Sequence, residues 1–209
     1  MKFILITTCC LITTNCVAQE VNLDQLRLPD GFSISVYADV ENPRQLALGS
    51  NNTVFVGNLR GRVYAIIDSN GDGAAEQVNT IAEGLNSPNG VAYYEGDLYI
   101  GEINRISKIR DINSKLNTLN QTETLNDSLP NRRHHGFKFL QVGPDGKMYL
   151  PVGAPCNVCE GEEIFATLLN MDLDGSNLEI IAKGIRNTCL LYTSPSPRDL
   201  STSRMPSSA

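Results

Sequence analysis

Residues 143–150 have the sequence GPDGKMYL, in which a tight polar turn leads directly into a short apolar strand. The same arrangement occurs twice earlier, as GSNNTVFVGN at residues 49–58 and as EGDLYIG at residues 95–101. The first two units continue into a second apolar segment, at residues 62–66 and 105–109. Glycine, asparagine and aspartate in turns, followed by β-branched and aromatic residues, are typical of β-hairpins.

The three units recur at intervals of about 45 to 50 residues, the length of one four-stranded blade of a β-propeller. Helical periodicity is weak throughout residues 19–188. We therefore predict an all-β fold, a β-propeller. A closed propeller of six blades would need about 270 residues or more, and the chain has 209. The sequence thus indicates an incomplete propeller, with about three of the six blades of a longer protein.

The charge and the apolar runs of the sequence argue against a nucleic-acid partner and against a membrane-spanning segment. The 23 acidic residues outnumber the 17 basic ones, and the formal net charge is −6. No basic stripe runs along the sequence, so nucleic acid is not the expected partner. Beyond the N-terminus there is no apolar run of membrane-spanning length, and we expect no membrane span.

The N-terminus has the pattern of an export signal. Lys2 supplies a positive charge, residues 3–12 form an apolar segment, and residues 16–18 (CVA) form a small-residue cleavage site. We predict a signal peptide at residues 1–18 and a periplasmic or secreted protein. Anchoring as a lipoprotein through Cys16 is the alternative, although the residues before this cysteine match a lipidation signal poorly.

The C-terminal residues 189–209 are rich in serine, proline and threonine and lack strand alternation. A disordered linker would have this composition, but the segment resembles translated adapter sequence more than native protein. We therefore expect residues 19–188 to form the native partial propeller. The tail, which includes Cys189, is expected to have no part in its function.

Two cysteines remain between the signal peptide and the tail, Cys156 and Cys159 in the sequence CNVCE. Haem attachment requires a histidine directly after the second cysteine, and Glu160 stands there. Zinc would need two further ligands, and the two histidines lie about twenty residues upstream. In an exported protein a disulfide is the favoured interpretation, and it would stiffen the loop that follows the histidines.

His134 and His135 are the only histidines in the chain, and they lie in RRHHG at residues 132–136. Histidine is the side chain best suited to accepting a proton near neutral pH. One that lies at the rim of a repeating β scaffold is a candidate general base. The alternative is an ordinary solvent-exposed histidine of a loop.

Two further motifs have a structural as well as a functional interpretation. Residues 68–73 (DSNGDG) match the start of a calcium-binding loop, but Asn79 occupies the twelfth position, where such a loop requires glutamate. We therefore favour a β-hairpin turn there. Arg186, where a fourth blade would begin, could clamp an anionic oxygen with its guanidinium group. Otherwise it is a surface arginine paired with a nearby acid.

Four landmarks occur in order along the chain: LPDGF at residues 28–32, LNSPNGVA at 85–92, HHG at 134–136 followed by GPDG, and DLDGS at 172–176 followed by GIRN at 184–187. Together they resemble the glucose/sorbosone dehydrogenase family. Members of that family are six-bladed propellers that use pyrroloquinoline quinone (PQQ). The resemblance covers about residues 26–188, nearly all of the predicted native chain.

The resemblance implies a PQQ-dependent dehydrogenase that acts on a sugar or aldose. His135 matches the catalytic base, which takes the proton of the anomeric hydroxyl while hydride leaves for the quinone. Arg186 and Asn187 match the pair that contacts PQQ, and Arg186 would stabilise negative charge on the quinone oxygen. Asn89 matches a substrate-facing polar residue.

The family's calcium ligands and its further PQQ contacts would follow residue 188. We therefore predict no metal ligand in the residues before it, and we expect the fragment alone to be inactive. In the soluble glucose enzymes an aspartate precedes the catalytic histidine, whereas His134 stands there in this chain. A neutral histidine does not favour imidazolium as a carboxylate does, which favours the sorbosone-like branch over glucose oxidation.

The electron acceptor and the particular sugar stay open. The main alternative function is a propeller that binds a carbohydrate or a protein without catalysis. A calcium-dependent lactonase of propeller type would need several acidic ligands that converge on the central channel, and the sequence shows no such set.

Overall fold

The structure of the protein is a computed structural model that describes residues 23–189 and residue 191. The predicted signal peptide at residues 1–18, with the proposed lipidation site Cys16, lies outside the described residues. The same holds for the predicted tail, apart from its residues 189 and 191.

The chain forms two compact units, residues 1–35 and residues 36–209. The described part of the first unit contains a short 3₁₀ helix, η1 (Leu23–Gln25), and a turn closed by a hydrogen bond from Phe32 N to Pro29 O at 3.2 Å. No helix in the described part of the chain is long and apolar enough to cross a membrane.

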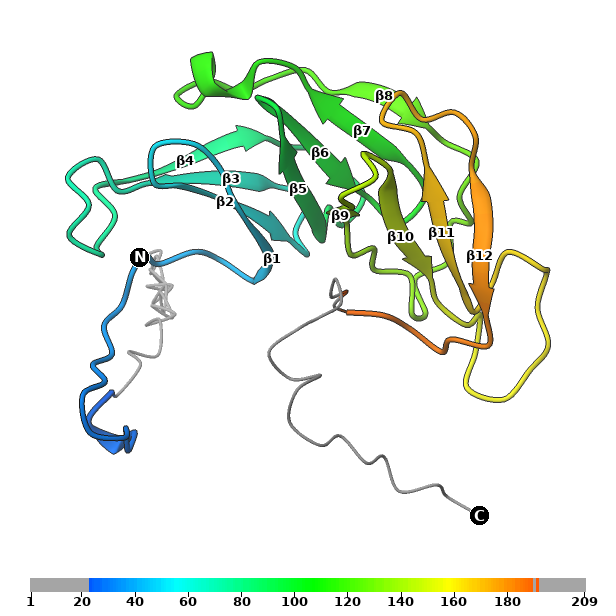
Figure 1. Cartoon of the computed structure of the whole chain (residues 1–209), viewed down its shortest axis with the longest axis horizontal. Coiled ribbons are helices and arrows are strands. Elements are labelled where there is room, and N and C mark those ends of the chain that lie inside the picture. The colour runs from blue at the N-terminus through cyan, green and yellow to red at the C-terminus, as the bar shows by residue number, and fades with distance from the viewer. Residues whose placement is uncertain (1–22, 190, 192–209) are drawn as a thin grey trace, which may run out of the picture. The chain divides into compact units, whose positions relative to one another are not determined.

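The second unit contains three antiparallel sheets of four strands each (Figure 1). The first sheet consists of β1 (Pro43–Leu48), β2 (Thr53–Asn58), β3 (Val63–Ile67) and β4 (Gln77–Ala82). The second consists of β5 (Gly90–Tyr94), β6 (Asp97–Gly101), β7 (Ile106–Ile109) and β8 (Glu123–Asn126), with the 3₁₀ helix η2 (Ile112–Ser114) before β8. The third consists of β9 (Gln141–Val142), β10 (Met148–Val152), β11 (Thr167–Met171) and β12 (Glu179–Lys183).

Each sheet is one blade of a β-propeller. Within every sheet the strands are neighbours in chain order, and each pairs antiparallel with the next. The first strands lie beside one another, because β5 contacts β1 on one side and β9 on the other. The three turn-and-strand units of the sequence are the first turn and the second strand of each blade. The predicted all-β fold with three propeller blades is confirmed.

Two of the three apolar clusters form layers on the two sides of the second blade. β6 shows how the sequence produces them, because successive side chains of a strand point to opposite faces of the sheet. Leu98 and Ile100 pack in the layer shared with the first blade, together with Phe55. Tyr99 packs in the layer shared with the third blade, together with Met148. A blade that is covered on both faces therefore has the continuous apolar run seen in its sequence.

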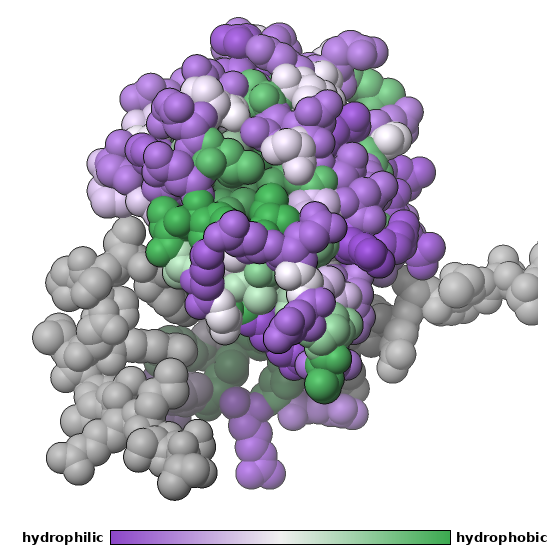
Figure 2. All heavy atoms as spheres, turned by 90° about the vertical axis from the view of Figure 1, so that its right-hand side faces the viewer, coloured by the Kyte–Doolittle hydropathy of each residue, from purple (hydrophilic) through white to green (hydrophobic). Residues whose placement is uncertain are grey.

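The outer faces of the first and third blades remain partly apolar. Leu46 and Leu48 of β1 are 61% and 74% exposed, and Ile181 of β12 is 44% exposed. On the side of the molecule that carries the third blade, apolar side chains gather among polar ones (Figure 2). Exposed apolar sheet faces of this kind are expected of an incomplete propeller.

In each blade, a glycine near the end of the second strand lets a segment that connects two blades pass close to that strand. Gly57 lies in β2, Gly101 ends β6, and Gly153 follows β10. An added Cβ would lie 2.7 Å from Pro88 O at Gly57, and 3.1 Å from Lys138 Cβ at Gly101. Any larger residue at these positions would push the connection away from the blade.

One side chain of β1 joins all three blades. Gln45 Nε2 donates a hydrogen bond to Leu140 O at 2.7 Å. Gln45 Oε1 accepts hydrogen bonds from Leu140 N at 3.0 Å and from Val91 N at 3.3 Å. Leu140 directly precedes β9 and Val91 lies in β5, and both residues are buried. Gln45 therefore satisfies backbone groups that would otherwise be buried without a partner.

Replacing Gln45 with alanine should destabilise the fold by about 2 to 3 kcal/mol, because three buried backbone groups lose their partner. Urea unfolding of the full chain measures the effect. Gln141→Ala is the matched control, since the Gln141 side chain is exposed and, within the described residues, donates only to the neighbouring Val142 O. Equal stability of the two variants would show that the blades do not depend on this side chain.

Candidate functional site

The residues predicted to bind substrate or cofactor or to act as the base all lie in the segments that connect or follow blades. Asn89 precedes β5, His135 lies between β8 and β9, and Arg186 and Asn187 follow β12. In a four-stranded antiparallel sheet the last strand ends where the first strand began. All connections between blades therefore cross the same end of the propeller, and these residues come from that end.

His135 lies in a tight turn. Gly136 N donates a hydrogen bond to Arg133 O at 3.0 Å, and His135 has a left-handed backbone with φ of 50°. The ring of His134 packs edge-on against that of His135, with centroids 4.1 Å apart and an interplanar angle of 63°. In an extended segment the side chains of neighbouring residues alternate, whereas this turn brings the two histidine rings into contact.

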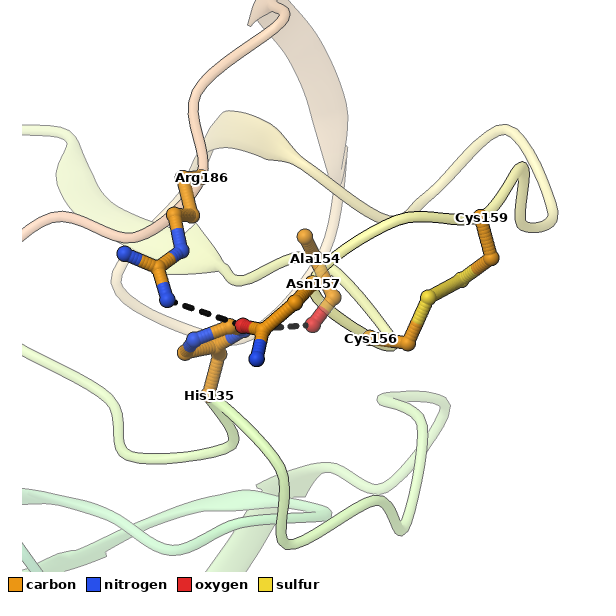
Figure 3. The surroundings of a disulfide bond; sticks show 6 residues. All are labelled: His135, Ala154, Cys156, Asn157, Cys159 and Arg186. Atoms are coloured by element: carbon orange, nitrogen blue, oxygen red, sulfur yellow. Dashed lines mark hydrogen bonds between the residues drawn. A yellow bond between two sulfur atoms is a disulfide. The ribbon is translucent and has the colours of Figure 1, made fainter.

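The ring of His135 is oriented by a backbone carbonyl. Its Nδ1 lies 3.0 Å from Ala154 O (Figure 3). A carbonyl oxygen can only accept, so this contact requires the proton of the neutral ring on Nδ1. Nε2 then carries the lone pair. The half-buried His135 is thus arranged as a base that accepts a proton at Nε2.

Arg186 lies in the same small region as His135. Arg186 O accepts a hydrogen bond from Ala154 N at 2.7 Å, while Ala154 O binds His135. The guanidinium group donates from Nη2 to Asn157 Oδ1 at 2.8 Å (Figure 3). Its partner in the described structure is therefore an amide, and not the acid expected of a surface ion pair.

Asn157 belongs to the loop closed by the two cysteines. Cys156 and Cys159 are joined by a disulfide, with Cα atoms 5.9 Å apart (Figure 3). Their sulfur atoms are bonded to each other, which leaves neither thiolate for zinc. The disulfide thus closes the loop that follows β10 two residues after Ala154, which binds both His135 and Arg186.

A cavity of about 430 Å³ opens at this end of the propeller. It is lined by Pro43, Arg44, Gln45, Leu46, Asn89, Phe137, Phe139, Asn187, Thr188 and Cys189. Asn89 and Asn187, both predicted from the sequence, meet here although they come from different connections. Cys189, which the sequence assigned to the tail, also reaches this wall.

Arg44 is the charged residue of this cavity that the sequence did not reveal. Its Nε donates to Asn89 Oδ1 at 3.2 Å, and its guanidinium carbon lies 5.7 Å from the ring centroid of Phe137. The arginine stands at the start of β1, as Asn89 stands before β5. This equivalent position at the beginning of a blade was the signal that could have identified it.

Asn89 connects two blades. Its Nδ2 donates to Lys138 O at 2.6 Å, its Oδ1 accepts from Arg44, and its side chain is buried. Both ends of the amide have protein partners, so Asn89 shapes the cavity wall and holds Arg44 in place. Its contact with a substrate stays a prediction.

Lys138 is a buried lysine beside the histidine turn. It is 1% exposed, and its Nζ donates to Gly136 O at 2.8 Å. Burial lowers the pKa of Lys138 from 10.5 to about 8, because a charged ammonium loses its hydration there. Among the described residues it has no ion pair. Lys138 therefore binds, from the protein interior, the backbone of Gly136, which directly follows His135.

A group of carboxylates lies at the other end of the first blade. Oxygens of Asp68, Asp72 and Glu76, in the β3–β4 connection, lie within 4.8 Å of one another. Asp68 accepts hydrogen bonds from Gly71 N at 2.6 Å and Gly73 N at 3.1 Å. These bonds form the hairpin turn favoured from the sequence. Because hairpin turns after odd strands lie opposite the connections between blades, this group is separate from the cavity.

Comparison with known proteins identifies the family. Residues 19–197 match the family described as "Domain of unknown function (DUF7133)", and the chain belongs to it. The match extends past the predicted domain boundary at residue 188. An uncharacterized protein of Borreliella burgdorferi is 25% identical over 198 residues, which are 89% of this chain and 51% of that protein. The chain therefore spans about half the length of this curated relative.

Solved structures with a similar fold include sugar dehydrogenases. The holo PQQ domain of pyranose dehydrogenase from Coprinopsis cinerea has a TM-score of 0.61 at 13% identity, over 71% of this chain and 40% of that one. A calcium structure of a Trichoderma reesei family AA12 enzyme has a TM-score of 0.56 at 13% identity, over 66% and 37%. PQQ-bound aldose sugar dehydrogenase of Streptomyces coelicolor has a TM-score of 0.50 at 14% identity, over 68% and 48%. At these identities the similarity establishes the propeller fold.

Replacing Gly153 with alanine should displace the histidine turn. The added Cβ would collide with His135 O and lie 2.6 Å from His135 Cβ. We expect a loss of about 2 kcal/mol in stability and a shift of the His135 imidazole signals in NMR spectra. Gly146→Ala is the control, because it adds a Cβ in open space at φ of 75° and should not change the His135 imidazole signals. Unshifted imidazole signals in Gly153→Ala would contradict the tight packing.

Lys138 should make stability depend on pH. Between pH 8 and 10.5 the unfolded chain binds a proton at this lysine that the folded chain does not, so stability rises with pH across this window. The gain of the wild type relative to Lys138→Met should reach about 3 kcal/mol. Urea unfolding of both proteins at several pH values measures this gain. Lys147→Met removes the charge of a more exposed lysine and serves as the control. A flat difference curve would contradict the burial of a charged lysine.

Proposed function

We propose that the full-length protein oxidises a sugar or aldose with PQQ at the end of the propeller that carries His135. The arrangement of His135 supports this function most strongly. Its Nδ1 contacts a backbone carbonyl, which leaves Nε2 as the base, and Arg186 is bonded to the same residue, Ala154. A base and an arginine that are both bonded to one residue would suit the removal of a proton and the stabilisation of negative charge.

The groups around the cavity fit a planar anionic cofactor. PQQ is a flat quinone with carboxylate groups, and when bound it would supply the hydride acceptor. Arg44 and Asn187 line the cavity and would hold the cofactor by hydrogen bonds. Arg186, which precedes Asn187 but does not line the cavity, would add a second guanidinium group. Phe137 and Phe139 offer flat apolar surfaces beside these donors. Calcium ligands are expected in the part of the protein that follows residue 188.

In this function His135 Nε2 would accept the proton of the anomeric hydroxyl as the neighbouring C–H bond gives up hydride. The carbonyl of Ala154 keeps the ring in the tautomer that leaves Nε2 able to accept. Arg186 would face the oxygen that gains negative charge. Asn89, which holds Arg44 through Oδ1, would form the substrate side of the cavity.

The environment of His135 also bears on the substrate. Its orienting partner is a neutral carbonyl, and its neighbouring side chain is His134. Neither carries the negative charge with which a carboxylate stabilises imidazolium. We therefore propose a substrate of the sorbosone-like branch and not glucose. An exported protein would encounter such a sugar in the periplasm or outside the cell, and the electron acceptor is unknown.

The experiment is dye reduction by the full-length protein loaded with PQQ and calcium, tested with a panel of aldoses. His135→Ala should lower turnover by about a hundredfold or more, as loss of a general base does. His134→Ala, the matched control, should lower it much less. Sugar binding without any oxidation in the wild type would favour a non-catalytic binding propeller. Full activity of His135→Ala would refute the assignment of the base.

A further inference from the structure

We propose that Asn157 and the Cys156–Cys159 disulfide form a clamp that holds the Arg186 guanidinium against the loop that also orients His135. Asn157 is then a positioning residue, and the disulfide fixes the loop that carries it. The catalytic consequence of the clamp rests on the function proposed above, whereas its effect on the position of Arg186 does not.

The position of the Arg186 side chain depends on Asn157. The side chain is exposed, and the hydrogen bond from Nη2 to Asn157 Oδ1 is the contact of its guanidinium group in the described structure. Arginine has many rotamers, and a single neutral hydrogen bond at the surface offsets little of their entropy. Arg186 is therefore held in one place only if Asn157 is itself held in one place.

Apart from an exposed ion pair between Glu163 and Lys183, the loop around Asn157 has little other support. Residues 157–163 are all exposed, and they contain no helix or strand. Val158, inside the loop closed by the two cysteines, is 95% exposed and so adds no apolar packing. The covalent link between Cys156 and Cys159 restricts the backbone of the two residues between them. The disulfide thus supplies the order that packing does not.

The clamp lies close to Ala154, the residue that binds both His135 and Arg186. Ala154 binds Arg186 through its N–H and His135 through its carbonyl, two positions before Cys156. One short segment therefore fixes the ring of His135, the backbone of Arg186 and, through Asn157, the guanidinium group. Figure 3 shows these residues converging, with the disulfide at the outer side of the loop.

The test uses NMR of the full chain and needs no cofactor. Asn157→Ala should release Arg186, so that the relaxation of its side-chain Nε becomes that of a freely mobile arginine. Asn157→Asp keeps an oxygen acceptor and should retain the ordered signal. Val158→Ala lies in the same loop, removes an exposed side chain and should change nothing.

The disulfide is tested by replacing Cys156 and Cys159 together with serine. Arg186 should again become mobile, and exchange of the Ala154 amide hydrogen should accelerate by about tenfold or more. In Asn157→Ala that amide should keep its protection, because its bond to Arg186 O involves the backbone only. This difference separates loss of the side-chain contact from loss of the loop.

Kinetics of the full-length protein with PQQ and calcium then measure the consequence. Asn157→Ala should lower kcat by about tenfold or more with little change in KM, and Asn157→Asp should restore much of it. An Arg186 that stays ordered in Asn157→Ala refutes the clamp. An unchanged kcat in that variant, with an active wild type, refutes its role in catalysis. A clamp seen by NMR in a wild type that oxidises no sugar would refute the proposed function and leave the clamp standing.

Discussion

The structure depends on the meeting of the first strands of neighbouring blades, whose backbone groups are buried there and need partners. Gln45 provides three of the hydrogen bonds that this meeting requires, to Leu140 and Val91. Such a constraint sets how closely the blades approach and in which register. Gly57 and Gly101 also allow the blades to approach closely, because only glycine lets the connecting chain pass so near the strand.

The candidate site follows from this arrangement. Once the blades are set, the segments between them cross one end, and side chains far apart in the sequence meet there. The contact between Arg44 and Asn89 joins residues separated by 45 positions. The site is held mainly by backbone carbonyls, because Ala154 O orients His135 and Gly136 O binds Lys138. It therefore needs no carboxylate beside the histidine to orient it.

Two features of the site store unfavourable free energy. His135 adopts a left-handed backbone, which is uncommon for a residue with a side chain, and Lys138 is a buried ammonium without an acidic partner among the described residues. Both lie within one short segment next to the cavity. Strain and desolvation of this kind persist when the surrounding structure holds them, and they concentrate at functional sites. The burial of Lys138 beside the histidine turn agrees with a functional role for the segment between β8 and β9.

The sequence by itself determined the all-β class, the three blades and their turns, because turn residues and strand alternation act over a few neighbouring positions. It also pointed to His135 and Arg186 and to the pairing of two nearby cysteines. The tertiary structure decided which way His134 turns, and it placed Arg44, Lys138 and Asn157 at the site. Those features arise from contacts between segments, such as the one that joins Gln45 to a residue 95 positions away. No local pattern encodes such contacts, because they exist only after the blades have packed around their common axis.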